Sequence, residues 1–222
     1  MRLNPGDHVC AIYSSDDELA EIVGDFLAEG LRRSERCWYV PAADNPKTVQ
    51  AALEARRIDT TRAAERGALS LLSSNAAYSV RGDFDPEETM AVFSDAIEQA
   101  LADGFSGFRA AANMSWALDL QAGPERLITY EALLRALFSN ARATGLCLYD
   151  RHRMPVAVID GALSTHPVVR VHGAYSANTF YDSSVRSLRT ADPTAVASKL
   201  DQLDAAAGEL PSDRSTDRHR RG

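Results

Sequence analysis

The sequence feature that most constrains the fold is a strand, a turn and a helix near the N-terminus. His8–Tyr13 is a short apolar run with β-branched and aromatic residues, typical of a strand buried on both faces. Ser15 and Glu18 have the spacing of a capping box, which predicts a helix starting near Asp16. A second strand-like run, Cys37–Val40, follows the helix. The segment therefore predicts a β-α-β unit with two parallel strands.

The turn between this strand and this helix lacks the groups that hold a nucleotide's phosphates. A phosphate-binding loop needs glycines, a lysine and a hydroxyl, whereas residues 13–18 are YSSDDE. The three carboxylates suit the positive end of the helix dipole and would repel phosphates there. The turn therefore predicts a scaffold that does not hydrolyse nucleotides.

The rest of the chain alternates strands and helices, which predicts a three-layer α/β/α fold with a mostly parallel central sheet. Residues 73–85 form a polar loop in this interpretation. The strand 108–114 ends at Asn113 without a carboxylate for magnesium, so a second requirement for nucleotide hydrolysis is missing. The other predicted strands are 68–72, 146–150 and 168–171. The predicted helices are 46–58, 86–103 and 155–163, together with one that begins at Gly123 and Pro124. Asn45 is the predicted cap of the helix 46–58.

Length and composition indicate one soluble domain. The 222 residues, 45% of them hydrophobic, can bury one sizeable core in residues 1–190, whereas 191–222 predicts a polar, disordered tail with weak helical character in 191–208. A net charge of -7 argues against nucleic-acid binding. No apolar run suffices to span a bilayer, and the three cysteines suit reduced thiols, so we expect a cytoplasmic protein.

Several separated blocks resemble a known family. The run FLAEGLRRSERCWYV resembles the opening unit of RecA-like ATPases of the circadian-clock type, with a degenerate nucleotide site. A closer resemblance, over residues 8–182, is to the MEDS domain, the sensory module of methanogen and methylotroph regulators and of the dichloromethane-responsive repressor. The blocks that carry it are HVCAIY, the same run FLAEGLRRSERCWYV, ANMSWAL, YEALLRAL, LCLYDRHRMP, THPVV and NTFYD.

This resemblance implies a bacterial sensory domain for small organic molecules, namely hydrocarbon derivatives, that acts in signal transduction or transcription control. Such domains are often joined to a DNA-binding or kinase-like output, and nothing after Tyr181 is long enough to be one. We therefore expect signalling through a partner such as a kinase, an anti-sigma factor or a DNA-binding protein, with homo-oligomerisation left open. We expect no enzymatic activity and no cofactor. The alternatives are an enzyme on the same scaffold, using Asp150 and His152 or a cysteine, and a pure protein-interaction regulator.

Ligands of open parallel sheets bind outside the carboxyl ends of the strands, which predicts a pocket at that edge. Trp116 would form a wall of this pocket, and the hydroxyls of Tyr13 and Tyr149 would orient a ligand. The alternative is that the aromatic residues only pack in the core. The predicted ligand-binding residues are Tyr13, Ser14, Ser15, Asn113, Trp116, Tyr149, Asp150, Arg151 and His152.

The cysteines and histidines form a separate candidate site. The strand order implied by the resemblance puts the first strand between strands 146–150 and 168–171, so Cys10 and Cys147 become neighbours. We interpret them as packed hydrophobic residues and predict no metal site. The alternative is a thiol or metal site with His8 and His166, whose spacing fits no zinc motif. Glu131, beside an apolar helical stripe, is expected to pair with an arginine such as Arg109 or Arg135.

Overall fold

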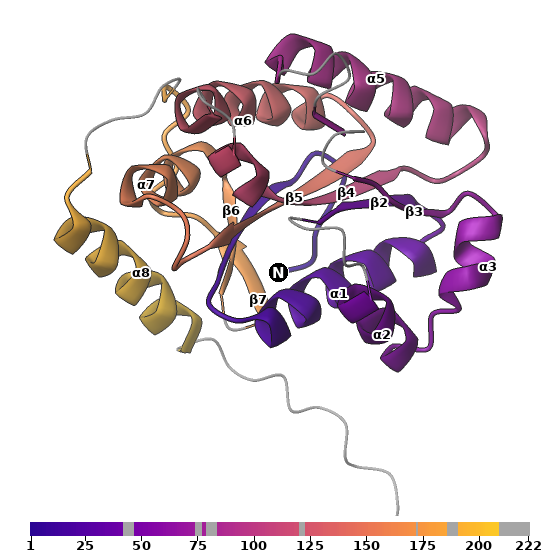
Figure 1. Cartoon of the computed structure of the whole chain (residues 1–222), viewed down its shortest axis with the longest axis horizontal. Coiled ribbons are helices and arrows are strands. Elements are labelled where there is room, and N and C mark those ends of the chain that lie inside the picture. Colours follow the sequence, from indigo (N-terminus) through magenta and orange to yellow (C-terminus); the bar gives the residue numbers. More distant parts are fainter. Residues whose placement is uncertain are drawn as a thin grey trace, which may run out of the picture.

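The computed structural model describes residues 1–41, 47–73, 77–78, 84–119, 123–171, 173–185 and 191–208. A seven-stranded sheet in the order β3-β2-β4-β5-β1-β6-β7 lies between two layers of helices (Figure 1). Every strand pair is parallel except β6 with β7. The strands are β1 (His8–Tyr13), β2 (Arg36–Val40), β3 (Leu69–Leu71), β4 (Phe108–Asn113), β5 (Ala143–Asp150), β6 (Val168–Val171) and β7 (Ala174–Ala177).

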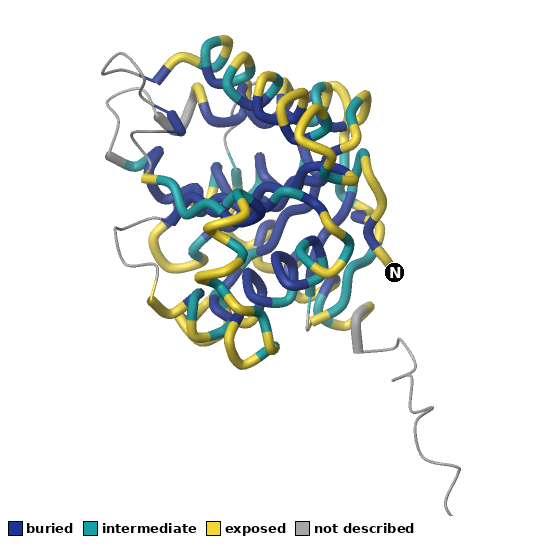
Figure 2. The backbone as a smooth tube through the Cα atoms, turned by 90° about the vertical axis from the view of Figure 1, so that its right-hand side faces the viewer, coloured by how far each residue is buried: buried dark blue, intermediate teal, exposed yellow. Residues whose placement is uncertain are grey.

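The two faces of the sheet carry separate cores. Helices α1 (Asp16–Arg32) and α2 (Lys47–Ala55) cover one face, and α5 (Pro86–Ala102), α6 (Gly123–Ser139) and α7 (Val156–Thr165) cover the other (Figure 1). Neighbouring residues of β1 alternate between them: Val9 and Ala11 pack toward α1, whereas Cys10 belongs to the core of α5 and α6. The central strands β1, β4 and β5 are almost entirely buried, and Figure 2 shows dark-blue strands between the two helix layers. Burial on both faces explains the near-continuous apolar sequences of these strands.

The predicted β-α-β unit and the Ser15 cap are confirmed, and the return bond of Glu18 goes to the Ser14 amide, one residue before the cap. The Ser15 hydroxyl accepts from the Glu18 amide at 3.2 Å, and the Glu18 carboxylate accepts from the Ser14 amide at 2.8 Å. The predicted strand order is confirmed too, because β1 lies between β5 and β6 and Cys10 pairs in register with Cys147. These two cysteines are therefore neighbours in the sheet.

Several element boundaries differ from the sequence expectations. The 3-10 helix η1 (Met114–Asp119) follows β4, and the short helix α3 (Thr60–Glu65) follows α2. Strand β7 was not predicted, because its four residues, AYSA, show no apolar alternation. The predicted cap Asn45 and most of the predicted loop 73–85 lie outside the described residues.

Residues 193–208 do not behave as the predicted polar tail. They form helix α8 (Pro193–Gly208), and Val196, Leu200 and Leu203 are buried in the core beside α7. The Lys199 ammonium also pairs with Asp160 of α7 at 2.5 Å. Three apolar residues at helical spacing are enough to dock α8, so the packed domain extends past residue 190; residues 209–222 lie outside the described part. Among the described helices, none is long and apolar enough to cross a membrane.

Candidate functional site

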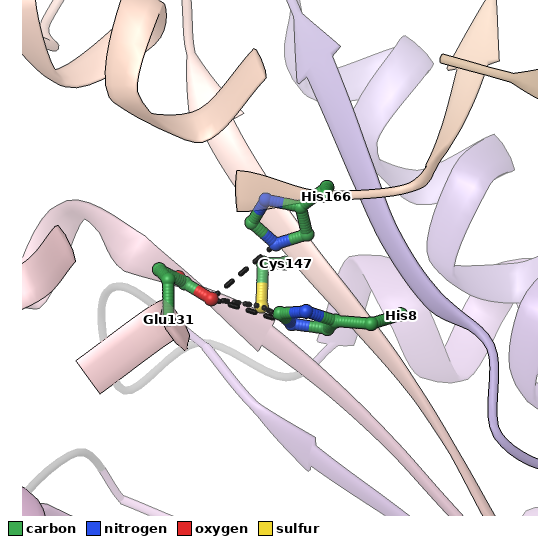
Figure 3. Close-up of side chains that lie close together, drawn as sticks. All are labelled: His8, Glu131, Cys147 and His166. Atoms are coloured by element: carbon green, nitrogen blue, oxygen red, sulfur yellow. Dashed lines mark hydrogen bonds and ion pairs between the residues drawn. The ribbon is translucent and has the colours of Figure 1, made fainter. Parts of the chain in front are cut away.

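Four side chains from four elements meet between the sheet and the helices α6 and α7 (Figure 3). His8 begins β1, Glu131 lies on α6, Cys147 lies within β5, and His166 follows the last residue of α7. One ligand atom from each, His Nε2, Cys Sγ or carboxylate Oε2, lies within 4.8 Å of all the others. All four residues are at most 2% exposed. We call this group the His-Glu-Cys-His cluster.

Glu131 is the centre of the cluster. Its Oε2 atom lies 3.3 Å from His8 Nε2, 3.3 Å from His166 Nε2 and 3.3 Å from Cys147 Sγ. The other oxygen, Oε1, accepts a hydrogen bond from the Tyr149 hydroxyl at 2.5 Å. Tyr149 therefore fixes the carboxylate so that Oε2 points into the cluster.

A backbone carbonyl fixes the tautomer of His166. The Nδ1 atom lies 2.8 Å from the carbonyl oxygen of Ala162, and because a carbonyl only accepts, Nδ1 carries the hydrogen. In the neutral ring the lone pair is then on Nε2, which faces Glu131 and has no hydrogen-bond partner among the described residues. Two acceptors thus face each other at 3.3 Å.

Burial and charge set the protonation of the cluster. Burial, together with the nearby His166, lowers the pKa of His8 to about 4. Burial alone would raise the pKa of Glu131, but His166 and His8 in their protonated forms outweigh burial through charge and hydrogen bonds and lower that pKa below its ordinary value. Burial and the carboxylate of Glu131 raise the pKa of the Cys147 thiol. At neutral pH His8 is therefore neutral and the Cys147 thiol protonated, so a charged Glu131 depends on a positive partner within the cluster.

The structure corrects the expected partner of Glu131. Arg109 pairs instead with Glu35, its Nε donating at 2.6 Å, on the opposite face of the sheet, and the Arg135 guanidinium lies over the Tyr181 ring. Cys10, named with His8, Cys147 and His166 as a metal candidate, is the sheet neighbour of Cys147 but not a member of the cluster. Sequence reasoning singled out Glu131 but did not place it with the histidines and Cys147. The available signal was its spacing, four residues after Leu127 and three before Leu134, which puts it on the buried side of α6.

A second site lies at the carboxyl ends of β1, β4 and β5. A cavity of about 310 Å³ is lined there by Tyr13, Asn113 and Asp150, three of the predicted ligand-binding residues. The Asn113 amide donates to the Tyr13 hydroxyl at 2.8 Å. The other lining residues are Asp16, Leu19, Ala20, Tyr39, Pro41, Thr48, Val49 and Arg153. We call it the carboxyl-edge cavity.

Other predicted residues lie around this cavity without lining it. Ser14 and Arg151 line a neighbouring cavity of about 270 Å³ between β1, β6 and α8. Ser15 caps α1, and His152 is exposed in a turn whose amide donates to Asp150 at 2.8 Å.

Trp116 and Tyr149 lie on the other face of the sheet. The Trp116 ring stacks on Tyr78, with centroids 4.1 Å apart, and packs edge-on against Phe84 and Tyr130. The Tyr149 hydroxyl is bonded to Glu131. Neither residue is among those lining the carboxyl-edge cavity, so the predicted aromatic wall and orienting hydroxyl are not found there. The sequence shows which residues end each strand but not which face a following 3-10 helix packs against.

The fold and the substituted phosphate site together define a RecA-like α/β domain without the phosphate-binding groups. Two solved structures are similar in fold. The flagellar accessory protein FlaH from Methanocaldococcus jannaschii gives a TM-score of 0.57 at 8% identity, over 78% of this chain and 76% of that chain. The KaiC-like protein PH0186 from the hyperthermophilic archaeon Pyrococcus horikoshii OT3 gives 0.52 at 12% identity, over 74% of this chain and 70% of that chain.

The family itself is given by a sequence comparison. Residues 7–167 match the model of the MEDS family, the MEthanogen/methylotroph, DcmR Sensory domain. The chain therefore belongs to the MEDS family, and its role is sensory or regulatory. A comparison with curated protein sequences finds no match.

We expect no magnesium-dependent ATP binding in the micromolar range and no ATP hydrolysis. The Glu18 amide is bonded to the Ser15 hydroxyl, the Ser14 amide is bonded to the Glu18 carboxylate, and β4 ends without a carboxylate. Titration calorimetry with ATP and Mg²⁺ should give no binding heat, with a buffer titration as the control. A tight, magnesium-dependent isotherm would contradict the expectation.

Proposed function

We propose that this domain is a non-catalytic sensor that binds a small hydrocarbon derivative in the carboxyl-edge cavity and signals through a partner protein. The membership of a sensory family supports the class of function. The observation that carries the ligand proposal is the cavity itself, which lies where ligands of open α/β sheets bind. The volume of about 310 Å³ suits a small molecule.

The lining of the cavity combines apolar and aromatic surface with polar and charged groups, which suits a small ligand that has both an apolar part and a polar group. Leu19, Val49 and Pro41 provide apolar surface, and Tyr13 and Tyr39 provide aromatic surface. Burial raises the pKa of the Tyr13 hydroxyl, which therefore stays neutral. Because Asn113 donates to its oxygen, the hydroxyl hydrogen is available to an acceptor on the ligand.

The partner would sense ligand binding through structural elements that line the carboxyl-edge cavity. The first turn of α1 and the strand end at Asp150 both line it, and Asp150 also accepts from the turn amides of His152 and Arg153 at 2.8 and 3.2 Å. A ligand that competes for Asp150 would loosen this exposed turn. The proposal therefore puts the partner, a kinase, an anti-sigma factor or a DNA-binding protein, near residues 150–153.

The test is a thermal-shift screen with short-chain alcohols, aldehydes, carboxylates and halogenated methanes. A compound that binds the native state raises the melting temperature. We expect Tyr13→Phe to reduce that rise for compounds that carry an acceptor, because it removes only the hydroxyl. Tyr181→Phe is the control, because it removes a hydroxyl from a residue that does not line the cavity and packs against Arg135.

Two results would count against the proposal. One is a screen in which none of these compounds raises the melting temperature of the wild-type chain. The other is a compound whose shift survives both Tyr13→Phe and Asn113→Ala in variants that remain folded, since its site would then lie elsewhere.

A further inference from the structure

The spacing of the His-Glu-Cys-His cluster matches a tetrahedral metal site. A tetrahedral Zn²⁺ with metal–ligand distances of about 2.0–2.3 Å holds its ligand atoms roughly 3.3–3.8 Å apart. Four of the pairs in the cluster are separated by 3.3 Å: Glu131 Oε2 from each of the other three atoms, and His8 Nε2 from Cys147 Sγ. Figure 3 shows the four side chains converging on one point from different elements.

A lone pair of His166 also points into the cluster. In its neutral form His166 presents the lone pair of Nε2 to the lone pairs of Glu131 Oε2, because its Nδ1 hydrogen is held by the Ala162 carbonyl. Burying the Nε2 nitrogen of His166 without a hydrogen-bond partner costs free energy of folding, unless another group binds its lone pair. A metal ion accepts both lone pairs, and the Nδ1 bond to a backbone carbonyl is the usual outer support of a metal-binding histidine.

Charge balance points to a divalent ion. A carboxylate at Glu131, in a site that excludes water, needs a positive partner. A divalent ion bound by one carboxylate, one thiolate and two neutral imidazoles leaves no net charge, and the proton of the Cys147 thiol passes to the solvent as the ion binds during folding. The single oxygen ligand disfavours Mg²⁺ and Ca²⁺, which take mostly oxygen, whereas the mixture of nitrogen, sulfur and oxygen suits Zn²⁺.

We propose that His8, Glu131, Cys147 and His166 bind one Zn²⁺-like divalent transition-metal ion, which joins β1, β5, α6 and α7. All four positions of the ion would be filled by protein, so the site is structural and not catalytic. Tyr149 supports it by holding Glu131 Oε1, and the Ala162 carbonyl supports it through His166. Since the site is closed to solvent, the ion enters as the chain folds.

The test uses Co²⁺ as a spectroscopic probe. The full chain is unfolded in denaturant with a chelator, freed of both, and refolded with Co²⁺. We expect one ion per chain, the visible bands of four-coordinate Co²⁺, and a near-ultraviolet charge-transfer band from a cobalt–thiolate bond. Added Zn²⁺ should abolish these bands, and protein refolded with Zn²⁺ should melt at a higher temperature than protein refolded with chelator.

Single cysteine variants locate the ion. Cys147→Ser should lose the charge-transfer band, because a serine oxygen replaces the thiolate. Cys10→Ser is the matched control, since Cys10 is equally buried and pairs with Cys147 in the sheet, and it should keep the band. Cys37→Ser, on the other face, should also keep it.

The wild-type chain alone can overturn the proposal. If it refolds with Co²⁺ to a native circular-dichroism spectrum but shows no cobalt bands, no bound metal by elemental analysis and no change in melting temperature with Zn²⁺, the cluster is only a buried ion pair between Glu131 and a protonated histidine. A charge-transfer band that is lost in Cys10→Ser and kept in Cys147→Ser would place the ion elsewhere. These readouts do not depend on the ligand screen, so each proposal can fail without the other.

Discussion

Replacing Arg109 by alanine lowers the free energy of unfolding by about 3–5 kcal/mol, the loss expected when one partner of a buried ion pair is removed. The Arg109 side chain is fully buried, donates from Nε to Glu35 at 2.6 Å and from Nη1 to the Phe26 carbonyl at 3.0 Å, and lies over the Phe26 ring. Alanine would leave Glu35, which is 4% exposed, with only the partly exposed Arg33, 3.3 Å away, as a charged partner. Urea denaturation of both proteins measures the difference.

Two further variants separate this effect from a general loss of charge. The double variant Arg109→Met with Glu35→Leu should recover much of the loss, because apolar side chains of similar size often replace a buried pair at little cost. Asp103→Ala, which breaks the exposed pair with Arg36, should leave the unfolding midpoint nearly unchanged. An Arg109→Ala protein with the unfolding midpoint of the wild type would show that the pair does not stabilise this face of the sheet.

Removing all residues after Thr190 should lower the melting temperature by several degrees, because it uncovers the surface on which α8 packs. Within α8, Leu203→Ala alone should cost about 2–5 kcal/mol, the usual range for a leucine removed from a core. Differential scanning calorimetry of the truncated chain and denaturation of the point variant measure the two effects.

The matched control within α8 is Gln202→Ala. Gln202 neighbours Leu203 in sequence but is exposed, so its replacement should change stability by no more than about 0.5 kcal/mol. Equal stabilities for Leu203→Ala and Gln202→Ala would mean that α8 does not dock on the domain in solution.

Local pattern was enough to predict the elements that build the sheet. The capping box of Ser15 and Glu18 and the apolar run of β1 act within a few residues, so the sequence determines them directly. Helix α8 was underestimated because its three buried residues are spread over a polar segment. Their contribution to stability depends on the apolar surface beside α7 against which they pack, and no pattern within residues 193–208 reveals that surface.

The candidate sites depend on contacts between elements and were predicted only in part. Tyr13, Asn113 and Asp150 were found because strand ends of a parallel sheet meet at one edge. Trp116 was placed at that edge by the same rule, but η1 turns it into the core beneath α5 and α6. His8, Cys147 and His166 were recognised as residue types that bind metals. Glu131 comes from α6, and no regular spacing in the sequence connects it with the other three residues.

The capping box at the start of α1 has a consequence for how this domain can be switched. The Glu18 carboxylate accepts a hydrogen bond from the Ser14 amide, just before the start of α1. A side-chain carboxylate therefore lies where a phosphate would bind at the N-terminus of such a helix. ATPases on such a scaffold would change conformation when the terminal phosphate of the nucleotide is hydrolysed. Their cycle is kept out of equilibrium by the continuous hydrolysis of nucleotide. Here the anion is covalently part of the chain and is never released. We therefore expect the occupancy of any ligand site to follow the ligand concentration reversibly. The domain would then report the concentration of its ligand at equilibrium and would not measure the time since a hydrolysis event.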